Sequence, residues 1–232
     1  MSKRNPVFCA LDVKTIDEAY DIGKTIAPHV GGLKIGMELF YSQGALGYAR
    51  IAELGLPIFL DLKLHDIANT VIEGLRALAP LKPSIINVHT HGGLKMMQAA
   101  AGAYSDQTHK PTIIGVTVLT SLDNHDLAQM GFANGASEQA LKMAKLANQA
   151  GLSGVVCSSH EIADIRAACG EDFKLIVPGI RPATATNDEQ KRVMTPQQAY
   201  ALGADVLVIG RPITQAPDPG AAAQAIATEL GV

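Results

Sequence analysis

The chain has 232 residues, of which 47% are hydrophobic, 18% charged and 4% aromatic. This balance excludes a disordered, collagen-like or low-complexity chain and predicts a sizeable buried core. Nineteen Lys and Arg residues stand against 22 Asp and Glu residues, a net charge of −3, so no positive excess indicates nucleic acid or an anionic membrane as a partner. We therefore expect a small-molecule ligand.

Neither a membrane span nor a secretory signal is expected. The apolar run after Pro6 is broken at Asp12, and no stretch approaches the roughly 18 apolar residues that a span requires. The three cysteines, Cys9, Cys157 and Cys169, are scattered and odd in number, which favours free thiols in a reducing compartment. We expect a cytoplasmic protein.

Short β-rich runs alternate with segments of helical period along the whole chain, which is typical of repeated βα units around a parallel sheet. Several runs are continuously apolar, as expected for strands covered on both faces. The predicted strands are residues 7–13, 32–36, 58–63, 85–89, 113–119, 154–157, 175–177 and 206–209. Eight units of about 29 residues fill the chain. The sequence therefore predicts an α/β fold, a single (β/α)8 TIM barrel occupying residues 1–232 as one domain.

Two longer turn-rich stretches, residues 122–136 and 179–195, follow predicted strands at their carboxyl ends. Barrel enzymes place their chemistry at this face. We expect both stretches to act as lids over a site there.

Opposite charges alternate where the third predicted strand ends. Asp61 and Lys63 are two residues apart, so on a strand their side chains point to one face, toward the barrel mouth. Lys34, on the neighbouring strand, and Asp12, which closes the first strand, can reach the same space. Charges that are partly desolvated in a cleft must be paired, and such clusters indicate a functional site rather than solvated strand ends.

This array suits proton transfer to carbon. A lysine held between two carboxylates stays protonated, because neighbouring negative charge favours its ammonium form. It then acts as a positioned acid beside a carboxylate. The pattern predicts a reaction in which a carbanion forms and is protonated, with no need for a metal.

Arginine-bearing turns follow the last two predicted strands, at Gly179-Ile-Arg181 and at Gly210-Arg211. Loops at this position in barrels often bind phosphate, since glycine lets backbone N–H groups approach the anion and arginine pairs with it in fork geometry. Gln190, in the polar loop after Arg181, is a candidate to cover a bound phosphate.

Other candidates are weaker. Thr120 and Ser121 end the fifth predicted strand and offer hydroxyl groups to a polar ring. His89 and His91 have a spacing that suits a metal, yet hydrogen-bonded histidines at strand ends are commoner than ligands. We expect no metal and no cofactor.

Together these residues resemble the orotidine 5′-phosphate decarboxylase family, whose members make UMP in pyrimidine biosynthesis. The run from Asp61 through Asp66 to Thr70 is similar to the family signature Asp-x-Lys-x-x-Asp-Ile-x-x-Thr. Ala68 departs from the pattern, because many members have proline there. The other matching blocks follow in order along nearly the whole chain and contain Asp12, Lys34, Thr120-Ser121, Arg181 and Gly210-Arg211.

The resemblance implies a cofactor-free carboxy-lyase that converts orotidine 5′-monophosphate to UMP and CO₂. Lys63 would protonate C6 of the pyrimidine, Asp61 would lie beside the departing carboxylate, and Lys34 would orient the array and touch the ribose. Asp66 and Thr70 would come from the second subunit of a homodimer, Asp66 as a member of the catalytic group. The remaining implied substrate contacts are Asp12 to the ribose, Thr120 and Ser121 to the pyrimidine, and Arg181, Gln190, Gly210 and Arg211 to the phosphate.

Two alternatives stay open. A sugar-phosphate lyase of the same barrel group, resembling hexulose-phosphate synthase, shares Asp-x-Lys-x-x-Asp but uses Mg²⁺; the Ile-x-x-Thr extension and the Gly-Ile-Arg-Pro turn argue against it. A nucleotide-binding barrel that has lost catalysis is expected to have a broken charged array, and here the array is complete.

Overall fold

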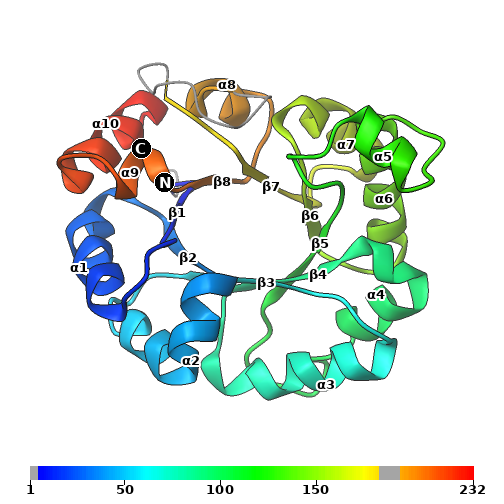
Figure 1. Ribbon diagram of the computed structural model, residues 1–232, viewed down its shortest axis with the longest axis horizontal. Helices are drawn as coiled ribbons and strands as arrows, with labels where there is room; N and C mark the ends of the chain where they lie inside the picture. The colour runs from blue at the N-terminus through cyan, green and yellow to red at the C-terminus, as the bar shows by residue number, and fades with distance from the viewer. Residues whose placement is uncertain (1–4, 183–193) are drawn as a thin grey trace.

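The computed structural model describes residues 5–182 and 194–232. Within them eight parallel strands pair in chain order, and β8 pairs with β1 to close the barrel (Figure 1). The predicted (β/α)8 fold is therefore confirmed. The strands are β1 (Val7–Ala10), β2 (Gly32–Gly36), β3 (Ile58–Leu64), β4 (Ile85–His89), β5 (Thr112–Val116), β6 (Gly154–Val156), β7 (Lys174–Pro178) and β8 (Val206–Ile209).

Helices form an outer ring around the strands (Figure 1). Several begin with a side chain that accepts a hydrogen bond from a free backbone N–H group of the first turn, as Thr15 does from Glu18. None of the helices in the described part of the chain is long and apolar enough to cross a membrane. The α-helices are α1 (Ile16–Ile26), α2 (Met37–Ala52), α3 (Ala68–Leu78), α4 (Gly93–Ala101), α5 (Asn124–Gln129), α6 (Ala136–Gln149), α7 (Ile162–Cys169), α8 (Pro196–Ala201), α9 (Arg211–Thr214) and α10 (Pro219–Leu230), and the 3₁₀ turns are η1 (Ala27–His29), η2 (Ala79–Leu81), η3 (Thr90–Gly92) and η4 (Ser159–Glu161).

Some predicted boundaries are wrong. Strands β1 and β5 end three residues earlier than expected, because the buried side chains of Val13 and Val118 continue the apolar pattern after strand pairing has stopped. The stretch 122–136, predicted as a loop, contains α5, which starts with a reciprocal capping box between Asp123 and Asp126. Of the second predicted loop, residues 183–193 lie outside the described residues.

Two hydrophobic layers form the core. Leu60, Ile86 and similar residues pack between the strands and the helices. On alternate positions, Phe8, Phe59, Ile85, Ile114 and Ile176 form a separate cluster that fills the barrel interior. Polar side chains appear two residues further along two of these strands, at Asp61 and Asn87. The polar site therefore lies directly above this interior cluster, which we call the apolar floor of the site.

Candidate active site

Four charged side chains at the carboxyl ends of β1, β2 and β3 form a connected array, which we call the charged tetrad: Asp12, Lys34, Asp61 and Lys63. The Nζ atom of Lys34 lies 2.7 Å from Oδ1 of Asp12 and 3.8 Å from Oδ2 of Asp61. The Nζ atom of Lys63 lies 2.7 Å from Oδ1 of Asp61. The array therefore runs Asp12, Lys34, Asp61, Lys63, with the charges alternating in sign.

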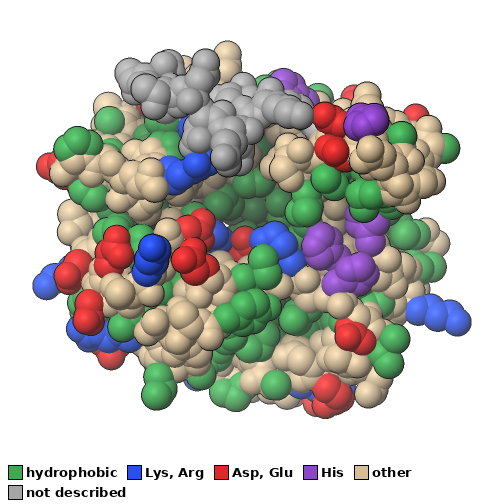
Figure 2. Space-filling model, in the orientation of Figure 1, with side chains coloured by type: hydrophobic (Ala, Val, Ile, Leu, Met, Phe, Trp, Pro, Cys, Tyr) green, Lys and Arg blue, Asp and Glu red, His purple; other side chains and the backbone are tan. Residues whose placement is uncertain are grey.

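Burial differs along the tetrad. The side chain of Lys34 is 8% exposed and that of Asp61 is 14% exposed, whereas Lys63 is 25% and Asp12 is 52% exposed. Lys34 and Asp61 thus form a desolvated centre, with Lys63 reaching toward solvent at one end. Figure 2 shows oppositely charged side chains around a hollow on this face, with a group of histidines beside them.

The backbone of β3 is irregular where the tetrad is formed. Leu60 pairs with Ile86 and Leu64 pairs with Val88, so three residues of β3 oppose one residue of β4. Lys63 has a φ angle of 53°, a left-handed conformation that is unfavourable for a residue with a side chain. The predicted contact between Asp61 and Lys63 is formed, but simple strand alternation is the wrong reason for it: a bulge brings the two side chains together.

A residue that the sequence reasoning missed links these groups. Asn87 of β4 is fully buried, its Nδ2 donates to Oδ1 of Asp61 at 2.6 Å, and its Oδ1 accepts from the backbone N–H of Lys63 at 2.8 Å. The available signal was a single Asn at an interior position of an otherwise apolar strand. Such an amide must find polar partners, because burying it without them costs about 1–3 kcal/mol.

Gly36 leaves room for the ion pair at the end of β2. A Cβ atom at this position would lie 2.9 Å from Oδ1 of Asp12 and 2.9 Å from Nζ of Lys34. Both atoms are at the tips of side chains, so the fold can accommodate the methyl group by displacing the ion pair.

We expect Gly36→Ala to fold normally and to lose about 10- to 100-fold in kcat/KM, because the Lys34 ammonium is moved from its position in the tetrad. Steady-state kinetics and thermal unfolding check this. Gly102→Ala is the matched control, since the nearest atom to its added Cβ is 3.7 Å away. An unchanged kcat/KM in Gly36→Ala contradicts the prediction.

Three of the predicted phosphate residues, Arg181, Gly210 and Arg211, lie just after the last two strands. The turn after β8 lies against β1, because a Cβ at Gly210 would be 3.3 Å from Cβ of Ala10 and 3.9 Å from Oδ2 of Asp12. Arg211 is exposed, and Arg181 is half-buried and donates to the carbonyl of Ile180. Gln190 lies outside the described residues. The Gly210 turn is therefore next to one end of the tetrad.

Other predicted residues surround the mouth without joining the tetrad. Thr120 and Ser121 follow β5 and are half-buried and exposed, respectively. Asp66 and Thr70 are exposed, and Oδ1 of Asp66 accepts from the backbone N–H of Ile67. Among the described residues, neither Asp66 nor Thr70 has an ion pair or hydrogen bond to the tetrad.

Three histidines lie together, and Lys63 acts electrostatically on one of them, His89. The ring of His89 lies 5.4 Å from that of His65 and 6.1 Å from that of His91, measured between ring centres. Burial lowers the pKa of His89 to about 4, helped by His65, His91 and Lys63 and opposed by Asp61. Among the described residues no group of three His, Cys, Asp or Glu side chains is arranged to hold a metal ion.

The low pKa of His89 predicts a loss of stability in acid. Below pH 6.5 an unfolded histidine takes up a proton, while folded His89 does so only near pH 4, so acidification from 6.5 to 4 favours the unfolded chain. We expect a contribution of about 1–2 kcal/mol, reduced because the ring is partly solvated. Urea unfolding across this range should show a flatter pH dependence in His89→Gln than in the parent chain, and no such change in the exposed-site control His160→Gln. The prediction is contradicted if the unfolding free energy has the same pH dependence in His89→Gln as in the parent chain.

The thiol next to the tetrad is not suited to nucleophilic catalysis. Cys9 is fully buried, and burial, followed by the charge of Asp12, raises its pKa to about 12 despite the opposing effect of Lys34. Because the thiolate is the reactive form, this cysteine is inert near neutral pH. The tetrad therefore supplies acid–base and electrostatic chemistry.

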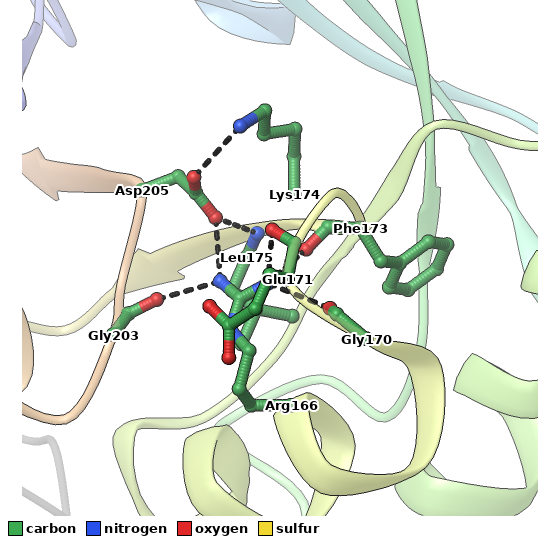
Figure 3. A network of polar contacts seen from close by, with 8 residues as sticks. All are labelled: Arg166, Gly170, Glu171, Phe173, Lys174, Leu175, Gly203 and Asp205. Carbon is green, nitrogen blue, oxygen red and sulfur yellow. Dashed lines mark hydrogen bonds and ion pairs between the residues drawn. The ribbon is translucent and has the colours of Figure 1, made fainter.

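The opposite end of the barrel has another character. A hollow of about 420 Å³ opens among the amino ends of the strands, lined by Phe8, Ile85 and Lys174 among others. Nearby, Arg166 donates to backbone carbonyls and to Asp205 (Figure 3). At this end of a barrel such a network serves stability rather than catalysis.

The sequence and the fold are similar to those of known proteins. The sequence matches the "Orotidine 5'-phosphate decarboxylase / HUMPS family" over residues 5–226. A relative from Rhodospirillum rubrum named orotidine 5′-phosphate decarboxylase is 48% identical, covering 98% of this chain and 94% of its own; one of the same name from Novosphingobium aromaticivorans is 46% identical, covering 97% and 99%. A crystal structure of orotidine 5′-phosphate decarboxylase from Lactobacillus acidophilus has a TM-score of 0.86 and 37% identity, covering 98% of this chain and 100% of its own.

Proposed function

The chain belongs to the orotidine 5′-phosphate decarboxylase / HUMPS family and is a decarboxylase, and we propose that its charged tetrad converts orotidine 5′-phosphate to UMP and CO₂. The observation that carries this proposal is the contact of 2.7 Å between Lys63 Nζ and Asp61 Oδ1, on a bulge at the barrel mouth. It provides a proton donor and a carboxylate next to one another, as carbanion formation and protonation require.

In the proposed reaction the bond between C6 and the substrate carboxylate breaks, and its electron pair stays on C6. The Lys63 ammonium gives a proton to C6, CO₂ leaves beside Asp61, and the lysine is reprotonated from solvent. Lys34, buried between Asp12 and Asp61, keeps the two carboxylates in position. Asp12 would bind a ribose hydroxyl, and Thr120 and Ser121 the pyrimidine.

No single charge is sufficient for the rate enhancement. A unit charge pair about 4 Å apart at an effective dielectric near 20 contributes about 4 kcal/mol, whereas enzymes lower barriers by up to about 23 kcal/mol. We propose that phosphate binding at Arg181, Gln190, Gly210 and Arg211 holds the ring against the tetrad and expels water. Binding energy from this non-reacting group then helps to lower the barrier.

We propose that the active form is a homodimer in which Asp66 and Thr70 of each subunit complete the partner's site. Both residues are exposed in the single chain. Ile67, next to Asp66 in sequence, and Met37 and Tyr41 of α2, which follows β2, are exposed large hydrophobic side chains, 72%, 42% and 68% accessible. An apolar surface around the mouth supports an interface there.

Mixing two inactive variants tests the shared site. In a heterodimer of Lys63→Ala with Asp66→Asn, one site carries both defects and the other carries none. Random exchange of equal amounts therefore should restore about a quarter of the parent activity. Activity that stays at the level of the separate variants contradicts a site shared between subunits.

Magnesium-dependent lyase chemistry is the second candidate, since the matched family also includes HUMPS. The curated relatives at 45–48% identity are named orotidine 5′-phosphate decarboxylase, which favours decarboxylation. In the tetrad each carboxylate already pairs with an ammonium group, so a divalent cation would have to compete with Lys34 and Lys63.

The deciding experiment mixes the purified protein with orotidine 5′-phosphate in EDTA and follows the loss of orotate absorbance. Turnover that continues in EDTA supports the proposal. If turnover requires added Mg²⁺, or if this substrate is not turned over at all, the result favours the magnesium-dependent sugar-phosphate lyase. The three free cysteines also fit our proposal that the enzyme works in the reducing cytoplasm.

A further inference from the structure

We propose that Asn87 is a positioning residue for the decarboxylation. It holds the backbone of Lys63 directly, and it holds Asp61, the ion-pair partner of the Lys63 ammonium group. This inference rests on the role proposed for Lys63. Asn87 touches two residues of the tetrad, Asp61 and Lys63, from the neighbouring strand β4.

The bulge in β3 creates the need for this amide. Between the pairs Leu60–Ile86 and Leu64–Val88, Asn87 alone stands opposite three residues of β3. A bulge leaves backbone groups without their strand partners. The Oδ1 atom of Asn87 accepts the N–H of Lys63 at 2.8 Å and so replaces a missing strand hydrogen bond.

The two ends of the amide act together. Nδ2 of Asn87 donates to Oδ1 of Asp61 at 2.6 Å, and the same oxygen accepts from Nζ of Lys63 at 2.7 Å. The three hydrogen bonds close a ring from the Lys63 backbone through Asn87 and Asp61 back to the Lys63 ammonium. The ring also fixes the orientation of the amide, because a flipped amide would place N–H against N–H and oxygen against a carboxylate.

The conformation of Lys63 makes this support necessary. A φ of 53° at a lysine costs about 1–3 kcal/mol and persists only when its surroundings hold it. Asn87 is fully buried above the apolar floor, where its bonds are shielded from water. Without the amide, the strand can relax and move the ammonium away from its position beside C6.

The first test is Asn87→Leu, which keeps the approximate volume of the side chain and removes both hydrogen bonds. We expect kcat to fall by about 100-fold or more, while the Kd for UMP changes by less than about 5-fold, because a misplacement near 1 Å is sufficient for such a loss in rate. Thr90→Val is the matched control: Thr90 is buried just beyond the same strand and bonds the carbonyl of Val116. It should lose stability without losing kcat.

A second variant, Asn87→Asp, separates positioning from general stability through its pH profile. A protonated carboxyl group at this position can still donate to Asp61 and accept from Lys63, whereas its ionised form faces the Asp61 carboxylate. We expect kcat of this variant, relative to the parent, to fall as pH rises and to recover toward acid. A merely structural role predicts a constant ratio.

The result that overturns the inference is a kcat within about threefold of the parent in folded Asn87→Leu, or, if that variant does not fold, a pH-independent kcat ratio in Asn87→Asp. Failure of the proposed function is distinguishable, because the parent chain then shows no turnover of orotidine 5′-phosphate in EDTA, and failure of the proposed role of Lys63 appears as turnover retained by Lys63→Ala. In that case Asn87 is judged by hydrogen exchange of the Lys63 amide, which should accelerate in Asn87→Leu and not in Thr90→Val; unchanged exchange rejects the positioning role.

Discussion

Replacing Lys63 by alanine is expected to lower kcat by about 10⁴-fold while UMP still binds within a fewfold of the parent affinity. The side chain is the proposed proton donor, and general acid catalysis by one group is worth up to about 10⁴-fold. The proposed phosphate contacts come from other loops and remain in place. Orotate absorbance measures the turnover, and calorimetric titration with UMP measures the binding.

The control is Lys142→Ala, which removes a lysine that is 56% exposed on α6 and whose ion pair among the described residues is with Glu138, one helix turn away. This variant should leave both kcat and the affinity for UMP unchanged. A purified, folded Lys63→Ala variant with parent-like kcat excludes Lys63 as the donor. If UMP binding is lost together with turnover, the lysine acts mainly in holding the nucleotide.

The largest loss of stability is expected at the other end of the barrel, for Arg166→Ala. Arg166 is 13% exposed and donates to the carbonyls of Gly170, Phe173 and Gly203 and to Oδ2 of Asp205 at 2.7 Å (Figure 3). Its removal takes a donor from each of these acceptors, although the N–H of Leu175 still donates to Oδ2 of Asp205. We expect the free energy of unfolding to fall by about 3–5 kcal/mol.

Asp205 links this network to the strands. Burial raises the pKa of its carboxyl group, but the N–H of Leu175 and the side chains of Lys174 and Arg166 outweigh this effect, so the pKa is lowered overall. Urea unfolding measures the loss. Arg76→Ala, at an arginine 45% exposed in a helix-surface pair, should cost less than about 0.5 kcal/mol. Equal losses of unfolding free energy in Arg166→Ala and Arg76→Ala contradict a structural role for the Arg166 network. The kcat per folded molecule should stay unchanged in both variants.

The barrel was predictable because parallel strands buried on both faces are continuously apolar and recur at a spacing that fits βα units. The charged tetrad was also predictable, since Asp61 and Lys63 interrupt an apolar strand. The bulge was not, because the pairing of Leu64 with Val88 depends on the neighbouring strand rather than on local sequence. Asn87 was missed for the same reason: its partners are known only when β3 and β4 are paired.

The spacing of Asp123 and Asp126 at the start of α5, which was not predicted, is a capping signal that is present in the sequence. The predicted sharing of Asp66 and Thr70 between subunits came only from a family resemblance, because one chain cannot indicate what faces it across an interface.

The contact between the Gly210 turn and Ala10 has a consequence for biosynthesis. During translation the first strand emerges from the ribosome long before the last, so the seam between them stays open until β8 has been made. A nascent polypeptide that ends before residue 206 has no β8 to close it. Nucleotide that contacts both sides of the seam would therefore bind only a chain that already contains β8.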